Sequence, residues 1–379
     1  MNAIHRAKPR YDYVILVLQG GGALGAYQAG VYEGMSEAGY APDWITGVSI
    51  GAINGALIAG NRHGKRIEQL RAFWDLASSG VPRTSPLFFN HWQHRFTQVG
   101  AALSSVVGVP GFFVPRLAPP ALMPDGDPGA LSIYDAAPLR KTLEQLVDFD
   151  LINRREVRLS IGAVNVRTGN PVYFDNRRTV IEPAHVLASG ALPPAFAPVE
   201  IDGEYYWDGG IVSNTPLWHA VDNSPAVETL VVQVDLFSAE GDVPKNFDQV
   251  VERHKDIMYS SKPRFDGTRV RRLRAALQRL LQKLPRYFKA DPDVKALQGT
   301  SRSRIDIVHL TNRRHSSGYA KDFEFSRPTI QELWAAGLDD ARRIVAHPER
   351  LRPSSAEESI RVYEPMRTSQ RAGSISGLV

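Results

Sequence analysis

The strongest constraint on the fold of this chain is that two strand-like segments each run directly into a glycine-containing turn and then a helical stretch. Residues Tyr13–Gln19 form a continuous, largely apolar run of β-forming residues, which is typical of a strand buried on both faces. A helical stretch follows over Ala26–Ala38, then a second strand over Trp44–Val48 and a second helix over Ser49–Ala59. This alternation predicts a parallel sheet with helices packed on its faces.

The rest of the chain changes character in blocks. Residues 79–132 are rich in proline and aromatic residues and contain no regular pattern, which is typical of a functional covering or a long loop. Later strands are predicted over 157–166, 171–174, 230–236 and 305–310, and later helices over 138–147 and 328–345. We therefore expect a flexible N-terminal arm (1–11), an α/β domain (12–236) that includes the 79–132 insertion or lid, a C-terminal extension (237–352) and a disordered tail (353–379).

Composition excludes several classes of protein. The sequence has 379 residues and no cysteine, which excludes a disulfide scaffold, a cysteine nucleophile and a thiolate metal site. No run approaches the ~18 consecutive apolar residues that a membrane-spanning helix needs. The N-terminus is basic, but the apolar run behind it is too short for a signal peptide. We therefore expect a cytoplasmic protein.

The most informative motif is Gly47-Val48-Ser49-Ile50-Gly51, which matches G-x-S-x-G between a predicted strand and a predicted helix. The turn is so sharp that the residues framing the serine must lack a side chain. It presents Ser49 at the N-terminus of a helix, where free N–H groups and the helix dipole favour negative charge. This is the environment that a serine nucleophile requires.

A second motif, Gly20-Gly21-Gly22-Ala23-Leu24-Gly25, follows the first strand and allows two interpretations. Its spacing satisfies G-x-G-x-x-G, the dinucleotide-binding fingerprint, but that fingerprint needs an acidic residue at the end of the next strand. Ser49 stands there instead, and Asp43 precedes that strand. The other interpretation is an oxyanion hole, in which backbone N–H groups of the glycine run stabilise a developing negative charge.

The third motif is Asp208-Gly209-Gly210, which continues to Asn214-Thr215-Pro216. Asp208 is a candidate proton acceptor for a serine nucleophile. A histidine is the rival, because the order Ser–Asp–His is the order found in α/β hydrolases. The histidines after Asp208 that this alternative concerns are His219, His254, His309, His315 and His347.

Together these motifs resemble those of the patatin-like phospholipase family. The matching residues are Leu18–Gly25, Gly47–Ala52 and Asp208–Gly210, in the family's order and at similar separations. Residues Leu187–Val199 also look like the family block that precedes the aspartate. The resemblance covers about residues 12–236, and the remainder looks like an extension seen in some bacterial members.

The resemblance implies an α/β fold, a three-layer sandwich with a mostly parallel central sheet, helices on both faces and a C-terminal α-rich extension. It implies a serine lipid acyl hydrolase with a Ser–Asp dyad, no histidine, no metal and no cofactor. Ser49 would be the nucleophile and Asp208 the base. The glycines would frame the nucleophile elbow (Gly47 and Gly51) and the oxyanion hole (Gly20, Gly21, Gly22 and Gly25), with the amides around Gly21 and Gly22 as donors.

One departure from the family concerns the substrate. Many members carry a basic residue where this chain has Leu24, so a positive charge near the oxyanion hole is absent. The implied substrate is an acyl ester of a lipid, and both a phospholipid and a neutral or shorter ester remain open. Because a carboxylate is a weak base for a serine hydroxyl, the site must exclude water, and we expect the 79–132 insertion to cover it.

The segment 268–286 places arginines and lysines around apolar residues at helical spacing. A helix of this kind can lie on an anionic bilayer, so we expect peripheral contact with the inner face of the membrane, while a plain surface helix is the alternative. No nucleic-acid-binding motif accompanies the charge. Two rival functions are a nucleotide-binding oxidoreductase that uses the Gly20–Gly25 turn and a catalytically silent lipid-binding protein. The oligomeric state is not predicted.

Overall fold

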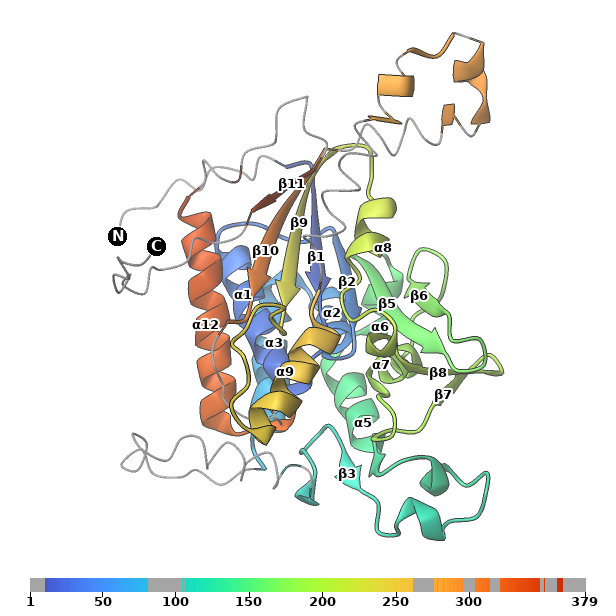
Figure 1. The fold of residues 1–379 in the computed structure, drawn as a ribbon, viewed down its shortest axis with the longest axis vertical. Coiled ribbons are helices and arrows are strands. Elements are labelled where there is room, and N and C mark those ends of the chain that lie inside the picture. The colour runs from blue at the N-terminus through green and yellow to red at the C-terminus, as the bar shows by residue number, and fades with distance from the viewer. Residues whose placement is uncertain are drawn as a thin grey trace, which may run out of the picture.

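The protein is a mixed α/β structure built on one central sheet (Figure 1). The computed structural model describes residues 11–80, 104, 106–261, 304–313, 321–347, 351 and 360–363, together with short pieces between 276 and 295. Within these ranges the sheet has nine strands, in the order β11-β10-β9-β1-β2-β5-β8-β7, with β6 also paired to β5.

Most of the strands are parallel, as the alternation of strands and helices predicted. The parallel strands are β1 (Tyr13–Leu18), β2 (Trp44–Val48), β5 (Arg158–Asn165), β9 (Glu228–Asp235), β10 (Arg304–Thr311) and β11 (Ile360–Tyr363). The antiparallel ones lie at the β5 end and are β6 (Pro171–Asp175), β7 (Val199–Ile201) and β8 (Glu204–Asp208). Because parallel strands end on the same side, the loops after β1 and β2 meet at one edge.

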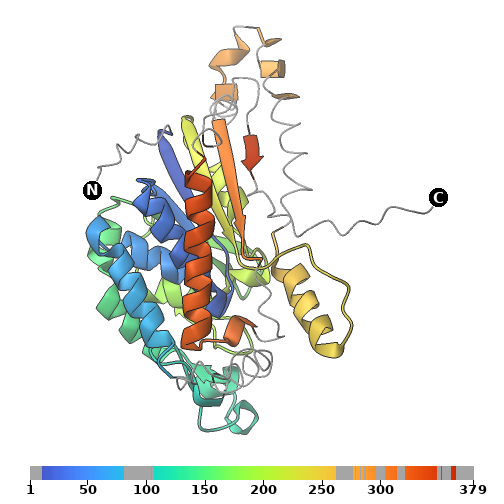
Figure 2. The same cartoon turned by 90° about the vertical axis from the view of Figure 1, so that its left-hand side faces the viewer.

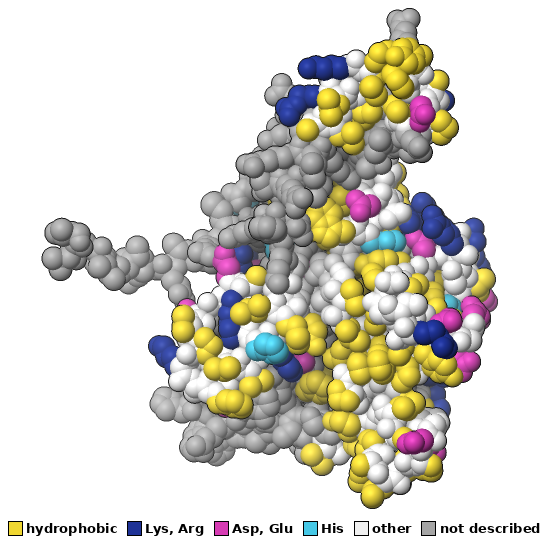
Figure 3. Space-filling view, turned by 45° about the vertical axis from the view of Figure 1, so that its right-hand side comes forward, with side chains coloured by type: hydrophobic (Ala, Val, Ile, Leu, Met, Phe, Trp, Pro, Cys, Tyr) yellow, Lys and Arg dark blue, Asp and Glu magenta, His cyan; other side chains and the backbone are white. Residues whose placement is uncertain are grey.

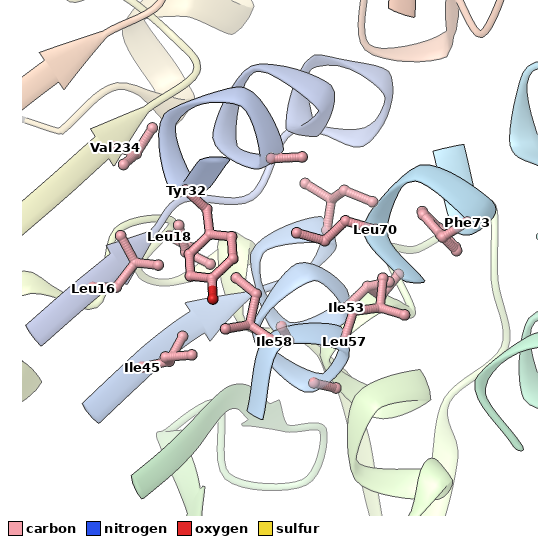
Figure 4. Packing of buried hydrophobic residues seen from close by; sticks show 14 of the residues in the cluster. Leu16, Leu18, Tyr32, Ile45, Ile53, Leu57, Ile58, Leu70, Phe73 and Val234 are labelled. Atoms are coloured by element: carbon pink, nitrogen blue, oxygen red, sulfur yellow. The ribbon is translucent and has the colours of Figure 1, made fainter. Parts of the chain in front are cut away.

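Helices cover both faces of the sheet. On one face Leu16, Leu18 and Ile45 pack with Tyr32 and Ile53 of two helices (Figure 4). On the other face, alternate residues of β1 pack against Leu217 and its neighbours. The helices are α1 (Ala26–Glu37), α2 (Ile50–Ala59), α3 (Arg66–Ala77), α5 (Ala137–Leu146), α6 (Phe149–Asn153), α7 (Pro183–Gly190), α8 (Leu217–Asp222), α9 (Phe247–Tyr259) and α12 (Arg327–Val345).

The described part of the 79–132 insertion packs against the domain. Phe113 is buried, and its ring lies 4.7 Å from that of Tyr134 and 5.6 Å from that of Phe196. The short strands β3 (Val114–Pro115) and β4 (Tyr134–Asp135) pair with each other. The aromatic residues between 81 and 103 lie outside the described residues, so a lid role for the whole insertion stays a prediction.

The C-terminal extension contributes strands as well as helices. β10 pairs with β9 along its whole length and β11 pairs with β10, so the sheet continues past residue 236. At the other end of the chain, Tyr11, which the predicted arm 1–11 included, is buried, and its hydroxyl donates to Asp306 at 2.8 Å. The rest of that arm and most of the basic segment 268–286 lie outside the described residues. The predicted tail 353–379 is described only at residues 360–363, which form β11.

The close contact between α1 and α12 depends on residues without side chains (Figure 2). A Cβ at Gly30 of α1 would lie 1.9 Å from the carbonyl oxygen of Trp334, and one at Gly337 of α12 would lie 2.0 Å from the carbonyl oxygen of Tyr27. The two helix backbones therefore touch. This contact ties α12 of the extension to the helix that follows the glycine run.

Replacing Gly30 with alanine should separate these helices. Alanine favours an isolated helix by about 1 kcal/mol over glycine, yet we expect Gly30→Ala to lower the free energy of unfolding by roughly 1–3 kcal/mol because the added methyl meets backbone. Urea unfolding measures this change. Gly64→Ala is the control, since a Cβ there meets nothing within 4 Å. Equal stability of Gly30→Ala and the unmodified protein would contradict the contact.

Candidate active site

Ser49 lies in the sharp turn between β2 and α2 and has a strained backbone. Its φ is 56° and its ψ is −125°, a region that non-glycine residues rarely occupy. A Cβ at Gly47 would lie 2.3 Å from the carbonyl oxygen of Gly51, and a Cβ at Gly51 would lie 2.3 Å from that of Leu18. The turn therefore requires glycine at both framing positions, which is the requirement inferred from the motif.

The strained turn is held by Ser189, a residue to which sequence reasoning gave no role. The backbone N–H of Ser49 donates to Ser189 Oγ at 2.9 Å, and Ser189 Oγ donates to the carbonyl oxygen of Gly162 at 2.6 Å. Ser189 is fully buried at the end of α7. Its hydroxyl thus ties the turn to β5. The only signal for it in the sequence was its place within the family-like block Leu187–Val199.

Asp208 ends β8 and lies next to Ser49. The sheet register explains this meeting, because Val48 pairs with Gly162 of β5 and Asp208 pairs with Ala163, the next residue of the same strand. The Ser49 side chain lies close enough to the Asp208 carboxyl to lower its pKa. Asp208 Oδ1 also accepts the N–H of Gly210 at 2.7 Å. The structure thus brings together the two residues that the motifs singled out.

Burial dominates the electrostatics of Asp208. The residue is only 2% exposed, and loss of water raises the pKa of its carboxyl from 3.8 to about 7. The hydrogen bonds from Ser49 and from the N–H of Gly210 act against this rise, because they stabilise the charged form. A carboxylate with a pKa near neutral is a much better proton acceptor at pH 7 than an exposed one.

The four glycines of the candidate oxyanion hole have different surroundings. Gly20 lies against Ser49, but its N–H donates to the carbonyl oxygen of Asn214 at 3.2 Å. Gly25 packs against Ile50. Within the described part of the chain the amides of Gly21 and Gly22 have no such acceptor, as expected for the start of the short helix Gly22–Gly25. The amides of Gly21 and Gly22, which the resemblance implied as the donors, therefore have no competing backbone acceptor, and their role stays a prediction.

The glycine loop also differs from a nucleotide site. Gly22 has a φ of 54°, and a Cβ there would lie 2.2 Å from the carbonyl oxygen of Asp322. A backbone oxygen thus packs on the loop at a place where a pyrophosphate would need hydrogen-bond donors. Asp43, the acidic residue that precedes the next strand, accepts the N–H of Val14 at 2.8 Å instead. The surroundings of the loop therefore disfavour the dinucleotide interpretation.

Two of the candidate triad histidines have other partners. His219 stacks on Tyr173 with ring centroids 3.8 Å apart and lies beside Trp44, which begins β2, whereas Ser49 follows the end of that strand. Burial, together with the charge of Arg158, lowers the pKa of His219 to about 4. His309 bonds to Asp235 at 2.7 Å. His315 lies outside the described residues. Neither of the two placements supports a histidine triad.

A cavity of about 240 Å³ lies beside residues 187–191. In this segment Ser189 and Ala191 accept the backbone N–H groups of Ser49 and Asp208. One wall is formed by Leu187, Gly190 and Ala191, which flank Ser189, and the carbonyl oxygen of Ala191 accepts the N–H of Asp208 at 2.9 Å. The insertion and α5 complete the cavity. Its lining is mainly apolar with two cationic groups and one carboxylate, and includes Phe112, Arg116, Tyr134, Asp135, Leu139, Arg140 and Phe196.

The described residues contain neither of two other kinds of site. Among the residues that the structure describes, no group of three or more histidine, aspartate or glutamate side chains is arranged to hold a metal ion. In the same residues no helix is long and apolar enough to cross a bilayer. Figure 3 shows that hydrophobic side chains gather in patches on one face, and exposed ones occur on α9 at Phe247, Val250 and Met258.

Known protein families match the chain in two segments. A family model described as patatin-like phospholipase matches residues 16–221, and one described as patatin phospholipase matches residues 257–357. The first match contains the elbow, the glycine run and Asp208. The second begins within α9 and covers β10 and α12.

Individual relatives are more distant. An uncharacterized NTE family protein of Mycobacterium tuberculosis strain H37Rv is 27% identical over 204 residues, which are 54% of this chain and 44% of that protein. Human patatin-like phospholipase domain-containing protein 6 is 40% identical over 68 residues, 18% of this chain and 5% of that protein. The chain therefore spans less than half the length of these curated relatives.

Among solved structures, VipD from Legionella pneumophila shares 15% identity with a TM-score of 0.36, covering 86% of this chain and 67% of that one. The type III effector ExoU shares 13% identity, also with a TM-score of 0.36, covering 92% and 55%.

The raised pKa of Asp208 predicts a pH-dependent gain in stability for Asp208→Asn. The folded protein keeps a proton that the unfolded chain releases above pH 3.8, so the unmodified protein loses stability as pH rises toward about 7. The Asp208→Asn variant has no carboxyl there and escapes this loss.

We expect the stability of Asp208→Asn relative to the unmodified protein to improve by about 2–3 kcal/mol between pH 5 and pH 8. Urea unfolding at both pH values measures the difference, and Asp125→Asn, at an exposed position, is the control. A constant difference across that range would argue against a buried, proton-sharing carboxyl.

Proposed function

Because the chain belongs to the patatin-like phospholipase family, we propose that it is a serine lipid acyl hydrolase that uses Ser49 and Asp208. The observation that carries the proposal is the placement of Ser49, in its strained turn, beside the buried Asp208 carboxyl, close enough for the Ser49 side chain to lower the pKa of that carboxyl. Nothing in the chemistry of this pair requires a metal or a cofactor.

The proposed reaction proceeds in two halves. Asp208 accepts the proton of the Ser49 hydroxyl as Ser49 Oγ bonds to the acyl carbon, and the carbonyl oxygen becomes negatively charged. The amides of Gly21 and Gly22 would hold that oxygen, and each such donor is worth about 3–4 kcal/mol. The alcohol then leaves with the proton from Asp208. Water, losing a proton to Asp208, attacks the acyl-enzyme, and Ser49 recovers its proton as the fatty acid departs.

The acyl chain has a suitable place in the cavity beside α7. The cavity is apolar where Leu187 and Phe196 line it, and the segment that forms its wall also holds both proposed catalytic residues. Arg116 and Arg140 add positive charge to the lining, and Asp135 adds a negative charge. We therefore propose a lipid ester as substrate, either a phospholipid or a neutral ester.

Variants of the two proposed catalytic residues test the reaction. We expect Ser49→Ala and Asp208→Asn each to lower kcat/KM by ~10³-fold or more toward p-nitrophenyl esters and phospholipid vesicles, because neither can start the attack. His219→Asn is the control and should keep most activity. Substantial turnover by folded Ser49→Ala would remove the proposal, and a loss in His219→Asn equal to that in Asp208→Asn would restore a histidine triad.

The pH profile tests the role of Asp208 as base. A base must be unprotonated to act, so kcat/KM should rise with pH through about 7 and level off above it. Initial rates between pH 4.5 and pH 9, with stability checked at each pH, measure the midpoint. A flat profile from pH 5 upward would show that a carboxylate with an ordinary pKa, or another group, accepts the proton.

Filling the cavity tests the place of the acyl chain. A Cβ at Gly190 meets nothing within 4 Å, so Gly190→Leu projects into open space next to the cavity lining without a steric clash. We expect kcat/KM for long-chain esters to fall ~10-fold or more while that for acetate or butyrate esters changes little, because only a long chain meets the new side chain. Gly64→Leu, also in open space, is the matched control. An unchanged chain-length profile would place the acyl chain elsewhere.

A further inference from the structure

One backbone carbonyl of the C-terminal region accepts hydrogen bonds from both loops of the proposed active site. Gln19, which leads into the glycine run, donates from Nε2 to the carbonyl oxygen of Tyr259 at 3.0 Å. Asn214, in the turn after Asp208, donates from Nδ2 to the same oxygen at 3.0 Å. A carbonyl has two lone pairs, so this oxygen is fully used. Tyr259 is the last residue of α9.

Asn214 is wedged between the two loops. Its carbonyl oxygen accepts the N–H of Gly20 at 3.2 Å, and its Nδ2 donates to the carbonyl oxygen of Gly20 at 3.1 Å. A Cβ at Gly20 would lie 2.4 Å from Asn214 Oδ1, and one at Gly210 would lie 2.8 Å from the same atom. The single side chain therefore sets the spacing between the loop beside Ser49 and the turn that follows Asp208.

Gln19 connects the turn after Asp208 and the end of α9 to the ends of β1 and β9 in the sheet. It is fully buried, and its Oε1 accepts the N–H groups of Leu236 at 2.6 Å and Phe237 at 3.0 Å. Its Nε2 also donates to Thr215 Oγ1 at 2.7 Å. The ends of β1 and β9, the turn after Asp208 and the end of α9 are thus joined through one amide group.

The end of α9 is itself held in place near the site. Lys255 pairs with Asp322 at 2.8 Å and Lys321 pairs with Asp256 at 2.6 Å, and the carbonyl of Asp322 packs on Gly22. The Tyr259 side chain lies within the field of Asp208 and Asp322, whose charges, after burial, raise the pKa of its phenol. The segment after residue 236 therefore packs over both candidate loops.

We propose that the C-terminal extension is a working part of the active site, in which the Tyr259 carbonyl, through Asn214 and Gln19, fixes the Ser49 and Asp208 loops relative to each other. This inference rests on the proposed function. Asn214 and Gln19 are positioning residues here, because they touch the loops and not the reacting atoms. A misplacement of about 1 Å between reacting groups can reduce the rate ~10²-fold. Hydrogen bonds that hold the two loops in place therefore matter for turnover, even though they do not reach the reacting atoms.

The test compares Asn214→Ala with Asn223→Ala. Asn223 also makes a side-chain bond to a backbone carbonyl, that of His219 at 2.9 Å, but at the end of α8. In Asn214→Ala we expect kcat to fall about 10–100-fold with little change in KM, because substrate contacts remain. The midpoint of the pH profile should move above that of the unmodified protein, since a weakened Ser49 bond no longer holds the pKa of Asp208 down. The charge of Asp208 acts on the Tyr259 phenol, and Tyr259→Phe, which removes that phenol, should leave the direction of this shift unchanged.

A second arm alters the extension alone. Lys321→Gln breaks the ion pairs with Asp256 and Glu252. It leaves the two positioning residues, Asn214 and Gln19, unchanged. We expect faster hydrogen exchange at residues 20–25 and 209–216 in both Lys321→Gln and Asn214→Ala, and unchanged exchange in Asn223→Ala. If Asn214→Ala does not fold, Asn214→Ser, whose hydroxyl is too short to bridge both loops, replaces it.

The outcomes separate this inference from the proposed function. Wild-type kcat, pH midpoint and exchange in folded Asn214 and Lys321 variants would overturn the coupling even if Ser49 proves essential. If the unmodified protein hydrolyses no ester or phospholipid, the proposed function fails, and faster exchange in both loops still reports the coupling. Activity loss with unchanged exchange in both loops would also contradict it, because positioning would not then be what was lost.

Discussion

The proposed site depends on the register of three strands, β2, β5 and β8. Ser49 follows the strand on one side of β5, and Asp208 ends the strand on its other side. The closeness of the two side chains requires this register, because a slip of one residue would turn them to the opposite face. The parallel sheet and its packed helices are therefore what make a two-residue site possible between positions far apart in the chain.

The proposed site contains a strained backbone and a buried carboxyl, and both cost free energy that the surrounding structure offsets. Ser49 has a positive φ, which costs on the order of 1–3 kcal/mol, and the Asp208 carboxyl is removed from water. Both are compensated locally, since Ser189 accepts the N–H of Ser49 and Gly210 donates to Asp208. Burial also gives the carboxyl a pKa near neutral. The same burial that lowers stability at alkaline pH therefore makes Asp208 a plausible base for a serine hydroxyl.

The part of the chain after residue 236 contributes to the sheet, to the helix packing and to the surroundings of the proposed site. Two of its strands extend the sheet, α12 packs on α1 through backbone contacts at Gly30 and Gly337, and α9 brings the Tyr259 carbonyl to the loops beside Ser49 and Asp208. The family match over residues 257–357 covers most of these elements. An extension that shares a sheet and a hydrogen-bond network with the site differs from a domain attached by a linker.

Much of the fold and the two central residues were predictable from local sequence. Buried strands are continuous apolar runs, and the G-x-S-x-G turn needs glycine for a reason that lies within five residues, so Tyr13–Leu18, Ser49 and its framing glycines were visible in the text. Asp208 was recognisable beside its two glycines once a nucleophile required a partner.

Only the tertiary structure decided the rest. The support from Ser189, the raised pKa of Asp208 and the hydrogen bonds of Asn214 to Gly20 and Tyr259 all depend on which strands lie side by side. Contacts between segments separated by a hundred or more residues leave no periodic signal in a single sequence, because burial and hydrogen-bond partners are set by the sheet order and not by neighbours along the chain.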